Sequence, residues 1–229
     1  MADAAPLTLD RDGEVFVLRM DDGENRFSPT LLDAFEAALD EVEGADGPRA
    51  LVTTGTGKYW SNGLDLDWIG AHPDEMVDNV ARVQALMARV LSLPCVTVAA
   101  GNGHTFAGGA MLALCHDIRT MRADRGWWCL PEVELGMPFT PGMNALIPAR
   151  LPTVTAHEAM VTGRRYTGTE ALAAGIVSSL SEEDRVVPDA VALAAPLAAK
   201  AGPGLARIRT TLHAGVIALL LDTGTDAAV

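Results

Sequence analysis

Positive charge is scarce in this sequence. Its 229 residues include 17 Lys and Arg against 30 Asp and Glu, which gives a formal net charge of -13. A nucleic-acid-binding surface needs clustered Lys and Arg, so the composition argues against a nucleic-acid partner and favours a small-molecule ligand. The length fits one domain with a substantial core.

Cysteines and long apolar runs are also scarce. Cys95, Cys115 and Cys129 lie in apolar segments without paired spacing, which argues against a disulfide framework. The N-terminus lacks the basic and apolar regions of a signal peptide, and the final residues, 227–229, do not match the Ser-Lys-Leu peroxisomal signal. The apolar run from Gly215 to Leu221 is too short to cross a bilayer. We therefore expect a cytoplasmic protein without a membrane partner.

Three common ligand motifs are missing. The loop ending in Gly57 and Lys58 fails as a P-loop, because Val52 and Tyr59 occupy the required Gly and Ser/Thr positions. The Gly101/Gly103 pair fails as a dinucleotide fingerprint, because Phe106 stands where the third Gly belongs. None of the five histidines has metal-ligand spacing with another, so we expect no metal.

The most informative stretch runs from Pro94 to Gly136. An apolar strand-like run is followed by a Gly-rich turn, and Gly108 and Gly109 then open a short apolar helix that we expect to end near His116. The free N–H groups and the positive dipole end of such a helix suit a carbonyl oxygen that acquires negative charge. Carboxylates follow at Glu132 and Glu134. This order suggests enolate chemistry.

The rest of the chain predicts an α/β fold, since strands, loops and helices alternate. Asp10 to Gly13 reads as the turn of a hairpin that ends at Met20. Ser28 and Pro29 predict the start of a helix that ends at Gly44. Further strands are expected at 49–54, 95–100, 118–121 and 126–130, and further helices at 73–93, 143–151, 155–161, 169–174, 190–199 and 204–221. In the 73–93 helix, the stripe Met76, Val80, Val83, Met87 and Val90 fits core packing, an acyl-chain pocket, or both.

Five motifs in register resemble the crotonase superfamily, also called the enoyl-CoA hydratase/isomerase family. They lie at 60–65, 100–109, 116–118, 131–136 and 167–177, and the resemblance covers about residues 7 to 213. It implies a spiral of ββα units in residues 1–140, with a C-terminal α-helical region in 141–229 that is used for oligomerisation and forms no independent domain. It also implies a homotrimer or hexamer. The substrate would be an acyl-CoA thioester, and because coenzyme A belongs to that substrate, no separate cofactor is expected.

The resemblance assigns roles to individual residues. The oxyanion hole falls on the backbone N–H groups of Leu64 and Gly108, and the catalytic base falls on Glu132. In the hydratases of this family a second glutamate helps to activate water, and that position is Met111 here. One carboxylate suffices for an isomerase, so the pattern favours a Δ3,Δ2-enoyl-CoA isomerase. The register favours Glu132 over Glu134 as the base.

The expected substrate-binding residues flank these groups: Arg26, Ser61, Asn62, Gly63, Leu66, Met111 and Phe139. Arg26 and Lys58 are candidates for contacts to the CoA phosphates. Asp65 and Asp117 fit local capping and hydrogen bonding, and His104 fits a structural role. Three alternatives keep the fold: a hydratase in which Glu134 replaces the missing partner, a thioesterase or decarboxylase, and a CoA-binding protein without catalysis.

Overall fold

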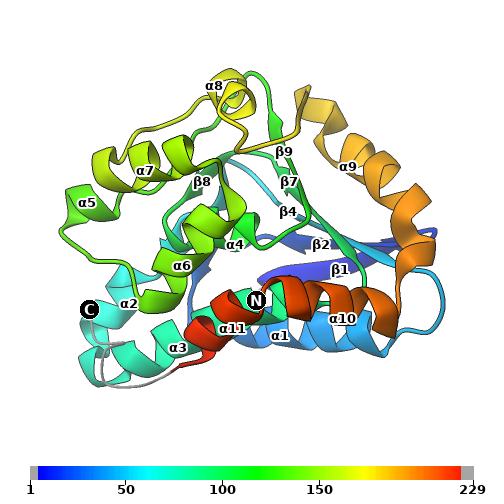
Figure 1. Cartoon of the computed structure of the whole chain (residues 1–229), viewed down its shortest axis with the longest axis horizontal. Helices are drawn as coiled ribbons and strands as arrows, with labels where there is room; N and C mark the ends of the chain where they lie inside the picture. The colour runs from blue at the N-terminus through cyan, green and yellow to red at the C-terminus, as the bar shows by residue number, and fades with distance from the viewer. Residues whose placement is uncertain (1–4, 223–229) are drawn as a thin grey trace.

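A six-stranded sheet organises the computed structural model, which describes residues 5 to 222 (Figure 1). Its strand order is β1-β2-β4-β7-β9-β11; β1 is antiparallel to β2, and the other neighbouring pairs are parallel. The strands are β1 (Leu7–Asp12), β2 (Val15–Met20), β4 (Ala50–Gly55), β7 (Val96–Gly101), β9 (Ile118–Arg122) and β11 (Ser179–Ser181). The predicted hairpin and the strands predicted at 49–54, 95–100 and 118–121 are confirmed, whereas the strand expected at 126–130 is shortened to Trp128–Cys129 in a smaller sheet. The expectation about residues 227–229 lies outside the described residues.

Successive strands alternate between this sheet and two smaller ones. The small sheets have the orders β10-β8-β5 and β3-β6. Their strands are β3 (Arg26–Phe27), β5 (Tyr59–Ser61), β6 (Gly63–Leu64), β8 (His104–Phe106) and β10 (Trp128–Cys129). Each repeat of the chain thus contributes a strand to the large sheet, then one or two strands to a small sheet, and then a helix. This is the expected spiral of ββα units.

The large sheet is covered on both faces, and every residue of its central strands β4 and β7 is buried. Val17, Val52 and Val98 pack against helix α9 (Val186–Ala194) on one face. Leu18, Leu51 and their neighbours join the larger core on the other face, with helices α1 (Pro29–Gly44), α3 (Met76–Ser92) and α4 (Gly108–Leu114). Successive strand residues point to opposite faces, which explains why the two cores interleave along each strand.

The local signal at Ser28 and Pro29 correctly predicted the start of α1. Ser28 caps α1, its hydroxyl accepting the N–H of Leu31 at 3.2 Å. Thr167 forms a capping box with Glu170 at the start of α8 (Gly168–Ala173). The remaining helices of this part are α2 (Leu66–Ala71), α5 (Glu132–Leu135), α6 (Pro141–Arg150) and α7 (Thr153–Thr162). Helix α4 ends at Leu114, two residues before the predicted end.

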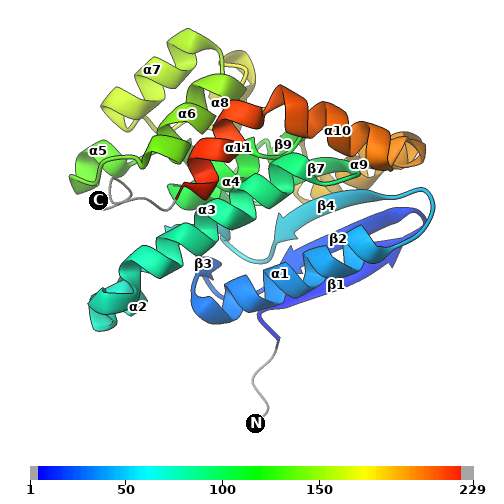
Figure 2. The same ribbon diagram turned by 60° about the horizontal axis from the view of Figure 1, so that its bottom comes forward.

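Three expected helices are interrupted. Pro73–Glu75 forms a 3-10 turn before α3, and Ala195–Lys200 forms another after α9. The expected helix at 204–221 is two helices, α10 (Pro203–Leu212) and α11 (Ala214–Leu221), bent by 78°. Tertiary contacts explain this break: Arg209 donates to the carbonyls of Leu91 and Cys95, which holds α10 against the end of α3, while α11 turns to pack on α3 and α6 (Figure 2).

No single helix within residues 5–222 is long and apolar enough to span a membrane. The bent pair α10 and α11 meets the length and composition criteria together, but not as one straight helix.

Candidate active site

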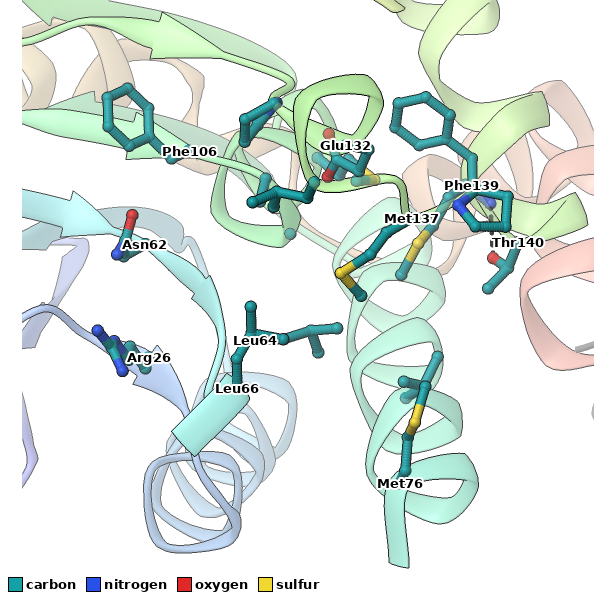
Figure 3. A pocket seen from close by; sticks show the side chains of 18 of the residues that line it. Arg26, Asn62, Leu64, Leu66, Met76, Phe106, Glu132, Met137, Phe139 and Thr140 are labelled. Carbon is teal, nitrogen blue, oxygen red and sulfur yellow. Dashed lines mark hydrogen bonds between the residues drawn. The ribbon is translucent and has the colours of Figure 1, made fainter. Parts of the chain in front are cut away.

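A cavity of about 350 Å³ opens between the small sheets, α3, α4 and α5. Its walls are mostly apolar. Arg26 and Asn62 lie on one side, and Met137, Phe139 and Thr140 lie on the other (Figure 3). The full lining is Arg26, Asn62, Leu64, Leu66, Asp67, Met76, Val80, Phe106, Ala107, Gly108, Met111, Pro131, Glu132, Leu135, Met137, Pro138, Phe139, Thr140 and Met143.

Glu132 brings a carboxyl group into this apolar cavity. It is the first residue of α5, which Gly136 ends in a left-handed conformation. Only 7% of Glu132 is exposed, and its Oε2 has no hydrogen-bond partner among the described residues. Because burial disfavours the charged form, the pKa of Glu132 rises from 4.5 to about 7. A carboxyl group with this pKa can accept and return a proton near neutral pH.

The backbone at the start of α4 lines the cavity. Helix-start N–H groups lack an intrahelical acceptor, and Gly108 is the first residue of α4. The preceding Ala107 has φ 50° and ψ -127°, a conformation that is costly for a residue with a Cβ and is typically kept at functional sites. Its N–H donates to the carbonyl of Cys129 at 3.1 Å, which anchors this turn against β10.

Leu64 is brought to the same place by the close approach of two backbones. β6 pairs with β3 in parallel, with Leu64 beside Phe27. Gly63 has φ +81°, and a Cβ there would lie 2.7 Å from the Gly108 nitrogen. Only glycine fits this conformation and this spacing. The backbones of Leu64, at the end of β6, and Gly108, at the start of α4, therefore lie close together on one wall of the cavity.

Ser61 and Gly63, two of the expected substrate-binding residues, shape this wall but do not line the cavity. Ser61 is fully buried; its hydroxyl donates to the carbonyl of Asn25 at 2.7 Å and accepts the N–H of Gly63 at 3.2 Å. A side chain with both hydrogen-bonding functions used internally has little capacity left for a ligand. The other expected binding residues, Arg26, Asn62, Leu66, Met111 and Phe139, do line the cavity.

Arg26 differs from the expected phosphate-binding cation because carboxylates already surround it. Its guanidinium lies 2.8 Å from Glu24, 3.7 Å from Asp65 and 2.5 Å from Asp67. Lys58 is exposed over the ring of Tyr59, 5.1 Å from its centroid, and does not line the cavity. Neither residue thus presents an unpaired charge inside the cavity.

The structure separates the two glutamates of α5. Glu134 is exposed and does not line the cavity; a Cβ added at Gly163 would lie 3.2 Å from its Cγ, so its side chain lies against the turn after α7. A helical turn, unlike an extended strand, sends residues two positions apart in different directions. Glu134 is therefore not placed to replace a missing carboxylate beside Glu132.

The apolar stripe of α3 is divided between the cavity and the core. In the α3 stripe, Met76 and Val80 line the cavity, while Val83, Met87 and Val90 are buried in the core; an acyl-chain pocket at Met76 and Val80 stays a prediction. Asp65 caps α2, its carboxylate accepting the N–H of Trp68 at 3.2 Å. Within residues 5–222, no group of three or more His, Cys, Asp and Glu is placed to hold a metal ion.

Comparison with known proteins identifies the family. The family model for enoyl-CoA hydratase/isomerase matches residues 10–226. The chain belongs to the enoyl-CoA hydratase/isomerase family. It is 35% identical to enoyl-CoA delta isomerase 2, peroxisomal, of Arabidopsis thaliana, over 93% of this chain and 94% of that protein. It is 34% identical to a putative enoyl-CoA hydratase of Thermus thermophilus, over 84% and 78%.

The solved structures agree with this assignment. A structure described as an enoyl-CoA isomerase of Mycobacterium tuberculosis matches with a TM-score of 0.86 at 28% identity, covering 96% of each chain. A second structure of the same protein, described as a probable enoyl-CoA hydratase, matches with a TM-score of 0.87 at 28% identity, covering 96% of this chain and 93% of that one. The crotonase-like fold predicted from the sequence is thereby confirmed. Family membership indicates an enzyme that acts on acyl-CoA thioesters, either as an isomerase or as a hydratase.

Ala107 and Thr140 line the cavity but were not predicted as site residues from the sequence. Ala107 precedes a helix, and an alanine side chain gives no indication that the backbone has a positive φ. Thr140 caps α6 and donates its hydroxyl to Gln84 at 2.7 Å. Thr140 before Pro141 is a recognisable N-cap signal, so its position at a helix start could have been predicted, although its place in the cavity could not.

Proposed function

We propose that this protein is a Δ3,Δ2-enoyl-CoA isomerase that uses Glu132 as its only proton shuttle. The observation that carries the proposal is the isolation of the Glu132 carboxyl group in an apolar cavity, with a pKa of about 7. The other carboxylate that lines the cavity, Asp67, has an 88% exposed side chain and is bound by Arg26. Glu132 is thus the carboxyl group best suited to acid–base chemistry.

The proton transfers follow from this arrangement. With the thioester carbonyl against the N–H groups of Leu64 and Gly108, the Glu132 carboxylate removes a proton from C2 of a 3-enoyl thioester. The C–H electron pair moves toward the carbonyl and produces a dienolate with its negative charge on the oxygen. Protonated Glu132 then returns the proton to C4, and the double bond now joins C2 and C3. No water is consumed, and the carboxylate is regenerated.

The two N–H groups would supply the electrostatic part of catalysis. A preset donor directed at a developing oxyanion contributes about 3 to 4 kcal/mol to transition-state stabilisation. The strained turn at Ala107 and the close contact between Gly63 and Gly108 support such preorganisation, because both fix the direction of the Gly108 N–H before substrate arrives.

Met111 supports isomerisation over hydration. It lines the cavity together with Glu132 and has no group that can orient or deprotonate water. Addition of water needs a second positioned polar group, whereas a proton shuttle needs one base and a dry site. The thioether also adds to the apolar surroundings that raise the pKa of Glu132.

The test is to incubate the protein separately with a 3-enoyl-CoA and a 2-enoyl-CoA in deuterated water, to separate the two isomers by chromatography against standards, and to identify hydration and hydrolysis products by mass. Isomerisation predicts that the 3-enoyl substrate becomes its 2-enoyl isomer, without a mass increase for added water. Conversion of the 2-enoyl substrate into a hydroxyacyl product would instead establish a hydratase. Release of free CoA would establish a thioesterase.

A further inference from the structure

The short helix α4 is held at both of its ends. At its start, the close contact of Gly63 with Gly108 fixes the backbone that lines the cavity. At its end, the last carbonyls cannot reach water, because every residue from Gly108 to Leu114 is buried. Buried helix-end carbonyls without an intrahelical partner need other donors. The side chains that supply these donors therefore determine how firmly α4 is held.

Arg150, the last residue of α6, supplies two donors at this end. Its Nε donates to the carbonyl of Leu114 at 2.8 Å, and a terminal guanidinium nitrogen donates to the carbonyl of His116 at 2.7 Å. These distances are typical of charge-assisted hydrogen bonds. The His116 ring adds a third contact, because its Nδ1 lies 3.0 Å from the carbonyl oxygen of Leu112 and its Nε2 lies 2.9 Å from the hydroxyl of Thr53. The end of α4 is thus bound to both α6 and β4.

The charge of Arg150 is directed at carbonyl groups. Arg150 forms no ion pair with a carboxylate of residues 5–222, and Asp117, an acidic residue near this end of α4, pairs with Arg209 at 3.1 Å. Arg119 also lies nearby, but its shortest hydrogen bond, 2.6 Å, goes to the carbonyl of Ile176. The Arg150 guanidinium is therefore the cation bonded most directly to the end of α4.

The position of this cation affects the opposite end of the helix. The peptide dipoles of α4 place partial positive charge at Gly108 and partial negative charge at Leu114. Because a helix of seven residues is only about 10 Å long, the negative end weakens the positive potential at Gly108. Burial in a low-dielectric core leaves this effect poorly screened. A guanidinium bonded to the negative end cancels part of it.

Helix α6 connects Arg150 with the cavity. It packs beside α4 (Figure 1), and its cap Thr140 and its residue Met143 line the cavity. The first turn of α6 therefore borders the ligand space, while its last residue bonds to the end of α4. A side chain placed by a packed helix is held more precisely than one on a loop, so α6 fixes the guanidinium relative to the cavity wall.

We propose that Arg150 is a positioning residue for catalysis: its cation fixes the end of α4 and strengthens the Gly108 N–H as a donor to the substrate carbonyl. The inference rests on the proposed function, because it requires a thioester carbonyl at Gly108. It extends the catalytic machinery to a residue that does not line the cavity.

The test uses a saturated acyl-CoA, which binds without isomerising, and measures the infrared stretching frequency of its thioester carbonyl. In the wild-type protein this frequency should fall on binding, because the N–H donors polarise the carbonyl. Arg150→Gln keeps an N–H donor and removes the charge, so the downward shift should become smaller. With a 3-enoyl-CoA, its kcat should fall by about 10- to 30-fold with little change in KM.

Two further variants separate this role from a purely structural one. Arg150→Lys keeps the charge and should retain most of the carbonyl shift and most of the activity. Arg89→Gln is the matched control, since Arg89 is also a partly buried arginine that bonds a helix carbonyl, that of Glu36 at 3.1 Å, but its partners lie on α1. Thermal denaturation shows which variants are folded.

The inference is overturned if the wild-type protein shows no carbonyl shift, or if folded Arg150→Gln keeps the full wild-type shift. It is also overturned if Arg150→Lys loses the shift completely, a result that can be read even where Arg150→Gln does not fold, or if Arg89→Gln reduces the shift equally. Failure of the proposed isomerase is seen separately: the wild-type protein would then shift the carbonyl of the saturated acyl-CoA and leave a 3-enoyl-CoA unchanged.

Discussion

The cavity has carboxyl groups on two sides, and the two sides differ in whether a cation pairs with them. At the Arg26 side, Glu24, Asp65 and Asp67 share one guanidinium and remain partly exposed. At the α5 side, Glu132 is buried, unpaired at Oε2, and has a pKa raised to about 7. Paired carboxylates in contact with water keep their charge and support local structure. A buried carboxylate without a cation is held near its protonation midpoint at neutral pH, which is costly for stability and useful for proton transfer.

The strongest test of this contrast is Glu132→Gln. We expect the isomerisation rate to fall by about 10³-fold or more with little change in ligand affinity, because the variant keeps the size of the side chain and removes the base. Glu134→Gln on the same helix is the control and should keep most of the activity. Rates with a 3-enoyl-CoA decide the question: an inactive Glu134→Gln beside a nearly normal Glu132→Gln would make Glu134 the base.

The second test addresses the cavity wall that contains Leu64 and Gly108. Gly63→Ala places a Cβ 2.7 Å from the Gly108 nitrogen, so it should displace the proposed oxyanion donor and lower kcat by about 10²-fold. Gly57→Ala is the matched control, because Gly57 also has a positive φ, +65°, but its Cβ would meet nothing within 4 Å. Both variants should lose some stability from backbone strain. Equal activity in the two would remove the role of the Gly63–Gly108 contact.

The fold was largely predictable because local signals and hydrophobic periodicity agreed. Ser28 and Pro29 marked the start of α1, and the apolar run before Gly101 marked the central strand β7. β11 was missed because three residues within a helix-rich region carry no clear period-two pattern. The break between α10 and α11 was missed because it depends on contacts of Arg209 with residues more than 110 positions away.

The residues of the candidate site were predictable where their position follows from the backbone and from the register of the sequence motifs. They were less predictable where their role depends on the side chains with which they form ion pairs or hydrogen bonds. Glu132, Leu64, Gly108 and Met111 do line the cavity, as the family resemblance implied. Arg26 was expected to be an available cation, but it pairs with Asp67 of α2, a helix that was not predicted from the sequence. Ser61 was expected to face the ligand, but its hydroxyl is used within the backbone. Side-chain pairing of this kind depends on three-dimensional proximity.

A third test measures the cost of burying the carboxyl group. The pKa of Glu132 is about 7 in the folded protein against an ordinary value of 4.5, so the folded state binds more protons than the unfolded state between these values. Stability is therefore lost as pH rises through this window. Glu132→Gln removes the titration and should raise the free energy of unfolding by about 3 kcal/mol near pH 8, with almost no gain near pH 4.5. Denaturant titrations at both pH values measure the difference. A gain that is the same at both would attribute it to packing.

The smallest effect is expected at the paired side. Asp67→Asn removes one carboxylate from Arg26 and leaves Glu24 and Asp65 in place. Because the Asp67 side chain is 88% exposed, water and salt screen its interaction, and the free energy of unfolding should change by less than about 1 kcal/mol. Chemical denaturation at low salt measures this change, and added salt should reduce it further. A loss above about 2 kcal/mol would mean that this ion pair is a structural requirement of the fold, and the two sides of the cavity would then differ less than their exposure indicates.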